Sequence, residues 1–197
     1  MARRFALADG GVVVLHETWL DAREAGALFT ALRDEVGWRQ ERIRIHGREH
    51  LQPRLVAWFG DAHASYTYSG LTLSPKPWSE RLGSLRRRVE DEAGVPFNSV
   101  LCNLYRDGQD SMGFHADAEP ELGHNPIIAS VSLGATRRFV MRHVRDVRER
   151  LDLDLPNGSL LVMEGTTQHF FRHGVPKQRS IAEPRINLTF RRILPRG

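Results

Sequence analysis

One stretch near the middle of the chain constrains the fold most strongly: Asn103-Leu104-Tyr105-Arg106-Asp107-Gly108-Gln109-Asp110-Ser111-Met112-Gly113-Phe114-His115-Ala116-Asp117. It predicts a strand, a turn and a second short extended run that ends in His-x-Asp. Residues two apart on a strand point to the same face, so His115 and Asp117 can aim at one point, and Asn103 and Tyr105 can share a face. A histidine and a carboxylate that converge in this way are two ligands of a metal site.

A third metal ligand is expected from a distant strand. The 2-His-1-carboxylate triad of non-haem Fe(II) oxygenases adds one more histidine and leaves open positions for a co-substrate and oxygen. Four histidines follow Asp117, namely His124, His143, His169 and His173. His173 is the best candidate, because it lies just before another extended segment.

That extended segment, residues 184–193, alternates strictly between apolar and polar side chains. One face carries Ile186, Leu188 and Phe190, and the other carries Arg185, Asn187, Thr189 and Arg191. A polar face with two arginines is unusual for a strand near the end of a compact domain. The planar guanidinium group matches a carboxylate bidentately, so this face predicts binding of a dianion.

Together these segments resemble the AlkB family of Fe(II)- and 2-oxoglutarate-dependent nucleic-acid dioxygenases, and within it the branch that repairs methylated bases in DNA and RNA. The resemblance rests on the following residues, in chain order: Tyr66–Thr72, Asn103-x-Tyr105, His115-x-Asp117, Pro126–Ser130, His173 and Arg185-x-Asn187-x-Thr189-x-Arg191. A lone His-x-Asp is a weak signal, whereas this ordered set is specific.

The resemblance implies which residues bind the metal and which bind the co-substrate. His115, Asp117 and His173 would hold Fe(II) and leave three positions, two for 2-oxoglutarate and one for O2. The co-substrate residues would be Asn103, Tyr105, Arg185, Asn187, Thr189 and Arg191. The two arginines lie about 20 Å apart along the strand. Arg191 is expected at the distal carboxylate of 2-oxoglutarate, and Arg185 near its 1-carboxylate.

A second set of residues is implied to contact the nucleotide. Tyr68 resembles the residue that stacks on the extruded base, with Tyr66 and Ser69 beside it, since aromatic faces stack on bases. Glu119 resembles the acidic residue that reads the exocyclic amino group. His46 takes the place of a hydrophobic wedge, which predicts a preference for single strands or for lesions that already disrupt pairing.

The activity implied by the resemblance is oxidative demethylation of N1-methyladenine and N3-methylcytosine in DNA, with RNA left open, releasing formaldehyde, succinate and CO2. A methyl group at these positions leaves a cationic base that cannot pair normally and is easier to extrude. One alternative is an oxygenase of the same fold that acts on a protein or a small molecule, which Tyr66, Tyr68, Glu119 and the basic charge disfavour. Another is a non-catalytic nucleic-acid-binding module, which the intact triad disfavours.

Composition agrees with this interpretation. The chain has 197 residues and a net charge of +4, and all but two of its 28 basic residues are arginine, a side chain suited to phosphate. The length suggests a single domain, with residues 1–97 as an N-terminal extension and nucleotide-recognition part and residues 98–197 as the catalytic core. One cysteine, Cys102, and no long apolar run favour a cytoplasmic protein away from membranes. A monomer is expected.

The periodicity predicts an α+β, mainly β fold. Helices are expected over residues 21–36, with Asp21 as N-cap, and over 78–93, with Gly94 after the end. Gly11–His16 is expected as an edge strand, and residues 145–154 as an exposed connection. Further strands are expected over 41–45, 54–59, 98–105, 114–117, 127–133, 138–144, 159–163, 168–171 and 185–193. Such spacing predicts a double-stranded β-helix, or jelly roll, buttressed by the two N-terminal helices.

Overall fold

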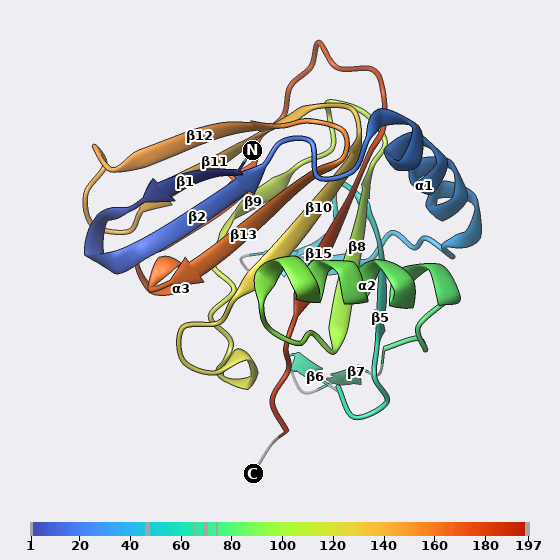
Figure 1. Cartoon of the computed structure of the whole chain (residues 1–197), viewed down its shortest axis with the longest axis horizontal. Helices are drawn as coiled ribbons and strands as arrows, with labels where there is room; N and C mark the ends of the chain where they lie inside the picture. Colours follow the sequence, from blue (N-terminus) through green and yellow to red (C-terminus); the bar gives the residue numbers. More distant parts are fainter. Residues whose placement is uncertain (1, 46–47, 65, 69–70, 74, 196–197) are drawn as a thin grey trace.

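The computed structural model of the protein describes residues 2–45, 48–64, 66–68, 71–73 and 75–195. For residues 43–45, 48, 66–68 and 71–73 it describes the backbone. Two antiparallel sheets face each other, and two helices lie across the outer face of the larger one (Figure 1). The predicted jelly roll with buttressing helices is confirmed.

The larger sheet has seven strands, in the order β1 (Ala2–Ala6), β2 (Gly11–His16), β13 (Ser159–Gly165), β10 (Ile128–Gly134), β15 (Arg185–Arg191), β8 (Ser99–Tyr105) and β5 (Leu55–Gly60). The smaller sheet has four, in the order β12 (Arg150–Leu155), β11 (Arg137–His143), β14 (Phe171–Val175) and β9 (Met112–His115). Two separate hairpins are β3 (Arg42–Ile45) with β4 (Arg48–Leu51), and β6 (Tyr66–Tyr68) with β7 (Leu71–Leu73). Strands from the first 97 residues, β2 and β5, pair directly with β13 and β8 from residues 98–197.

The helices form where the sequence pattern predicts them. α1 (Ala22–Glu35) begins after Asp21, whose side chain accepts a hydrogen bond from the Glu24 N–H at 2.8 Å. α2 (Glu80–Ala93) ends at Gly94, which takes the left-handed conformation with φ 70°. A single helical turn, α3 (Thr167–Phe170), and two 3-10 turns, η1 (Ala8–Gly10) and η2 (Pro120–Leu122), complete the elements. Among the described residues, no helix is long and apolar enough to cross a membrane.

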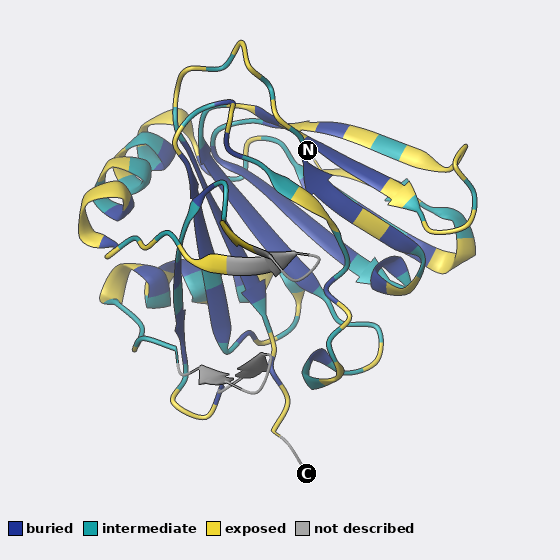
Figure 2. Ribbon diagram, turned by 180° about the vertical axis from the view of Figure 1, so that it is seen from behind, coloured by how far each residue is buried: buried dark blue, intermediate teal, exposed yellow. Residues whose placement is uncertain are grey.

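The polar face of β15 is explained by the two layers of the core. Ile186, Leu188 and Phe190 pack against the helices, in a cluster that also holds Leu32 of α1 and Leu85 of α2. The opposite face of β15 points between the two sheets and is also buried. The central strands of the large sheet are buried along most of their length when seen from behind (Figure 2). The polar residues of β15 therefore line the interior.

Four local expectations are wrong. Gly11–His16 is not an edge strand, because β1 pairs along its outer side. Residues 145–154 are not all a connection, because β12 begins at Arg150 and buries alternate leucines. The strand expected over 114–117 is Met112–His115 instead, so Asp117 lies beyond its end. Residues 168–171 are mostly the helical turn α3 and not a strand.

Candidate metal centre

The predicted triad is assembled where β9 and β14 lie side by side. His115 lies directly opposite His173 in the antiparallel register, and their ring centroids are 4.4 Å apart. Asp117 Oδ1 lies 4.0 Å from His115 Nε2, and Asp117 Oδ2 lies 4.0 Å from His173 Nε2. One ligand atom from each residue lies within 4.8 Å of the other two, so all three can bind a single metal ion.

One carboxylate oxygen of Asp117 is hydrogen-bonded, and the other is available to bind a metal ion. Oδ1 accepts a hydrogen bond from Arg191 Nη2 at 2.7 Å. Oδ2 is buried and has no hydrogen-bond partner among the described residues. A buried charged oxygen without a partner is costly, which a bound cation would relieve. The donor set of two histidines and one carboxylate oxygen therefore fits Fe(II).

The electrostatics of the site keep Asp117 and His173 in the protonation states that bind metal. Burial raises the pKa of Asp117, but the charge of Arg191 and the two neighbouring histidines outweigh burial and hold this pKa at about 2. Burial, followed by the proximity of His115, lowers the pKa of His173 to about 3. At neutral pH the carboxylate is charged and His173 is neutral, and each can coordinate a cation.

A pocket extends from the triad between the two sheets. Its polar wall consists of Asn103 and Tyr105 from β8, Ser130 from β10, and Arg185, Asn187, Thr189 and Arg191 from β15. These strands are neighbours, since Arg185 lies opposite Tyr105 and Asn187 opposite Asn103 in the β15–β8 register. All six of the predicted co-substrate residues are therefore brought to one cavity wall beside the metal ligands.

Arg185 is a buried cation with unused donors. It is 1% exposed, its Nη2 donates to Ser132 Oγ at 2.8 Å, and its Cζ lies 5.3 Å from the Tyr105 ring centroid. Nε and Nη1 have no partner among the described residues. Burial lowers the pKa of Arg185 to about 10, which still leaves it charged at neutral pH. A fully buried guanidinium with two open donors is suited to a carboxylate.

The two arginines of β15 lie in the opposite order to the one expected. Arg191 is at the metal end, bound to Asp117, and Arg185 is six residues away along the strand. Spacing alone separates the two ends of the pocket but cannot say which end holds the metal. The expectation that Arg191 lies far from the metal ligands is wrong, so Arg185 is the candidate for the distal carboxylate.

Two residues that contact the site were not predicted from the sequence. Arg54, just before β5, donates from Nε to Asn103 Oδ1 at 2.8 Å. This contact turns the amide NH2 group of Asn103 away from Arg54, so Asn103 can act as a donor in the pocket. Gln168, in α3, accepts from the Asp117 N–H at 2.9 Å. No sequence pattern marks either residue, because each acts through a contact far along the chain.

The residues predicted to contact the base remain predictions. His46 and Ser69 lie outside the described residues. Tyr66 and Tyr68 lie in β6, whose backbone pairs with β7, but their side chains are outside the described part. Glu119 is half-buried and lies directly before η2, two residues after Asp117.

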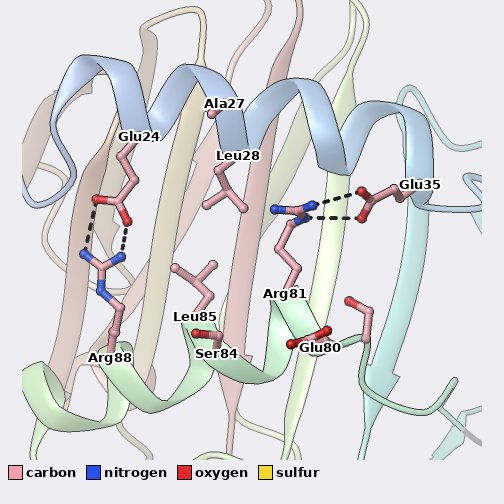
Figure 3. A pocket seen from close by; sticks show the side chains of 10 residues that line it. Glu24, Ala27, Leu28, Glu35, Glu80, Arg81, Ser84, Leu85 and Arg88 are labelled. Atoms are coloured by element: carbon pink, nitrogen blue, oxygen red, sulfur yellow. Dashed lines mark hydrogen bonds and ion pairs between the residues drawn. The ribbon is translucent and has the colours of Figure 1, made fainter.

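A larger groove lies elsewhere, between α1 and α2 on the outer face of the large sheet (Figure 3). Leu28 and Leu85 lie within it, and two ion pairs bridge the helices, Arg88 with Glu24 and Arg81 with Glu35. Glu24 and Glu35 are thus neutralised, and the large sheet separates the groove from the triad. Exposed pairs of this kind contribute little to stability, and the groove offers no catalytic chemistry.

Comparison with known proteins agrees with this geometry. The sequence pattern of the 2OG-Fe(II) oxygenase superfamily matches residues 11–191, so the chain belongs to this superfamily. The alpha-ketoglutarate-dependent dioxygenase alkB homolog 3 of Homo sapiens is 43% identical over 201 residues, covering 96% of this chain and 70% of the relative. The DNA oxidative demethylase ALKBH2 of Bos taurus is 45% identical over 183 residues, covering 87% of this chain and 66% of the relative.

Within the superfamily the chain is a member of the AlkB family. A solved structure, that of OsALKBH1, superposes with a TM-score of 0.67 at 18% identity and covers 98% of this chain and 100% of its own, which supports the fold. The protein is an Fe(II)- and 2-oxoglutarate-dependent dioxygenase, with His115, Asp117 and His173 as the residues that fit the iron. When bound, iron and 2-oxoglutarate supply the oxidising chemistry.

Proposed function

We propose that the protein removes methyl groups from N1-methyladenine and N3-methylcytosine in DNA, and that it acts on RNA as well. The observation that carries this proposal is the intact triad beside a dianion pocket, in a chain 45% identical to a protein named DNA oxidative demethylase. Oxidation of the N-methyl group gives a hydroxymethyl group, which is released as formaldehyde and leaves the unmodified base. We also propose a monomer in the cytoplasm.

The residues of the pocket have distinct tasks in this proposal. Arg185 binds the distal carboxylate of 2-oxoglutarate through its two open donors. Arg191, at the metal end, fixes Asp117 and lies where the 1-carboxylate would be held. Asn103, turned by Arg54, donates a hydrogen bond to the co-substrate, and Tyr105 closes the end of the pocket beside Arg185. Asn187 and Thr189 complete the polar wall between the two arginines.

A nucleic-acid substrate is supported by a row of arginines on the outer face of the small sheet. Arg150, Arg142 and Arg172 lie directly opposite one another across β12, β11 and β14, and all three are exposed. Arg150 is paired with Asp152 at 2.6 Å, whereas Arg142 and Arg172 have no ion-pair partner among the described residues. Like charges placed directly opposite destabilise a sheet, so Arg142 and Arg172 suggest a bound anion. Arg142 also lies over the exposed ring of Phe114 at 4.2 Å, one residue before His115. A phosphate backbone passing beside the catalytic site would fit this row.

Removing one charge from this row should weaken binding of nucleic acid without affecting 2-oxoglutarate. For Arg172→Gln we expect the slope of log affinity against log salt on a single-stranded oligonucleotide to become shallower by about 0.7, the value for one lost phosphate contact. Fluorescence anisotropy over a range of salt concentrations measures it. The matched control is Arg87→Gln, an exposed arginine of α2 on the opposite side of the molecule. Equal slopes for Arg172→Gln and wild type would remove this row from the binding surface.

The test of the proposed function uses oligonucleotides that each carry one defined N-methyl base. They are incubated with the protein, Fe(II), 2-oxoglutarate and O2, and the repaired base is measured by mass spectrometry. We expect repair of N1-methyladenine and N3-methylcytosine in DNA, and faster repair in single strands than in duplexes because extruding a paired base costs a few kcal/mol. Succinate release without repair of any lesion in the panel would favour the alternative of a protein or small-molecule substrate.

A further inference from the structure

The three residues of the triad are held in different ways. His115 and His173 both lie on paired strands, and the β9–β14 register places them opposite each other. Asp117 lies beyond the end of β9, which stops at His115, and before η2 begins at Pro120. No strand ladder therefore fixes the main chain of Asp117, although this residue is 3% exposed.

A side chain fixes this main chain instead. The Asp117 N–H donates to Gln168 Oε1 at 2.9 Å, across 51 residues of sequence. Gln168 is 2% exposed and lies on the single turn α3. The turn is itself anchored, because Thr167 Oγ1 accepts from the Val12 N–H at 3.0 Å and can donate to the carbonyl of Glu164 or of Val12. Through α3, Gln168 thus links the carboxylate ligand to strand β2 of the large sheet.

The surroundings also fix which way the Gln168 amide faces. Its Nε2 lies 3.5 Å from Met163 Sδ, a weak acceptor with no proton to donate. If the amide were turned over, its NH2 group would face the Asp117 N–H, and two donors would oppose each other. Its carbonyl would face the Met163 sulfur, which has no proton to donate. Only one orientation satisfies the buried N–H of Asp117. The amide is therefore a defined, preorganised contact.

We infer that Gln168 is a positioning residue of the metal centre. It holds the main chain of Asp117 while Arg191 holds Oδ1, and together these contacts leave Oδ2 facing the metal position. Groups that orient metal ligands typically change metal affinity by 10- to 100-fold when removed. The inference rests on the metal site and not on the nucleic-acid substrate, so its failure would leave the proposed demethylation untouched.

The test is metal affinity in the full-length protein. Gln168→Met keeps the length of the side chain and removes the carbonyl acceptor. We expect its affinity for Co(II), measured by titrating the metal-free protein and following the visible absorption of the ion, to fall by about 10-fold or more. The absorption spectrum should change as well, because a displaced carboxylate alters the coordination geometry. Circular dichroism and thermal unfolding of the metal-free variant establish that the fold is retained.

Two further variants separate positioning from structure. Gln168→Glu, as the neutral acid that burial favours, keeps an oxygen acceptor for the Asp117 N–H and an O–H donor toward Met163 Sδ, and should recover most of the lost Co(II) affinity. His169→Ala changes the exposed neighbour on α3 and should leave the affinity unchanged. A folded Gln168→Met protein with wild-type affinity and spectrum would overturn the inference. If Gln168→Met does not fold, a loss of 10-fold or more in Gln168→Glu would overturn it, since the acceptor is still present.

Discussion

Asp117→Ala should reduce the conversion of 2-oxoglutarate to succinate by more than about 100-fold, beyond what is typical for loss of a residue that merely orients a ligand. The substitution removes the one anionic ligand of the triad and leaves Arg191 without its carboxylate partner. A positive charge would then lie unneutralised beside the metal position and oppose binding of a cation. Succinate is measured with saturating Fe(II), 2-oxoglutarate and a methylated oligonucleotide.

Asp117→Asn is the matched control for shape. It keeps an oxygen that can accept from Arg191, but it removes the negative charge that a divalent cation requires. We expect this variant to be nearly as inactive as Asp117→Ala while unfolding at a temperature close to that of wild type. Wild-type succinate release by either variant, with iron present, would mean that the triad is assigned wrongly.

Arg185→Met should raise the KM for 2-oxoglutarate by about 30-fold or more, with a smaller effect on kcat. Truncating one partner of a buried charged pair costs about 2–5 kcal/mol, because the remaining carboxylate would lie in the pocket without its cation. Methionine preserves the volume of the buried stem, so the strand β15 should remain paired with β8 and β10. Steady-state succinate formation over a range of 2-oxoglutarate concentrations measures the change.

The shorter acid 2-oxobutyrate makes this test specific for the distal carboxylate. It keeps the 1-carboxylate and the 2-oxo group but ends in a methyl group. Wild type should use it poorly, and Arg185→Met should use it about as well as wild type does, so the preference for 2-oxoglutarate should collapse in the variant. An equal loss with both acids would place Arg185 away from the distal carboxylate and would return that role to Arg191.

The parts of the fold that follow local periodicity could be predicted from the sequence. The strict alternation of β15 and the polar and apolar faces of α1 and α2 each report which side of an element is buried. The caps of the helices could also be read, because Asp21 and Gly94 act on the adjacent turn. Charged strands such as β1 and β12 were missed because their many charged residues are typical of exposed loops, although each pairs with the strand next to it in the chain.

The site was predictable as a set of residues but not as an arrangement. His115, Asp117 and His173 were found because their types and order match a known chemistry. The order of Arg185 and Arg191 depends on the direction in which β15 runs past the metal end, and this is a property of the assembled sheet. Gln168 had no signal in the sequence, because a single glutamine becomes informative only when a partner 51 residues away is known.

The most direct test of the central claim is the coupling between co-substrate and substrate. Succinate and formaldehyde are measured together, with DNA that carries one N3-methylcytosine and with the same DNA unmodified. We predict that the methylated strand stimulates succinate release and yields about one formaldehyde for each succinate in excess of the background, as expected when one oxidation removes one methyl group. Succinate release that is the same with and without the methyl group, and that yields no formaldehyde, would contradict a role in nucleic-acid demethylation.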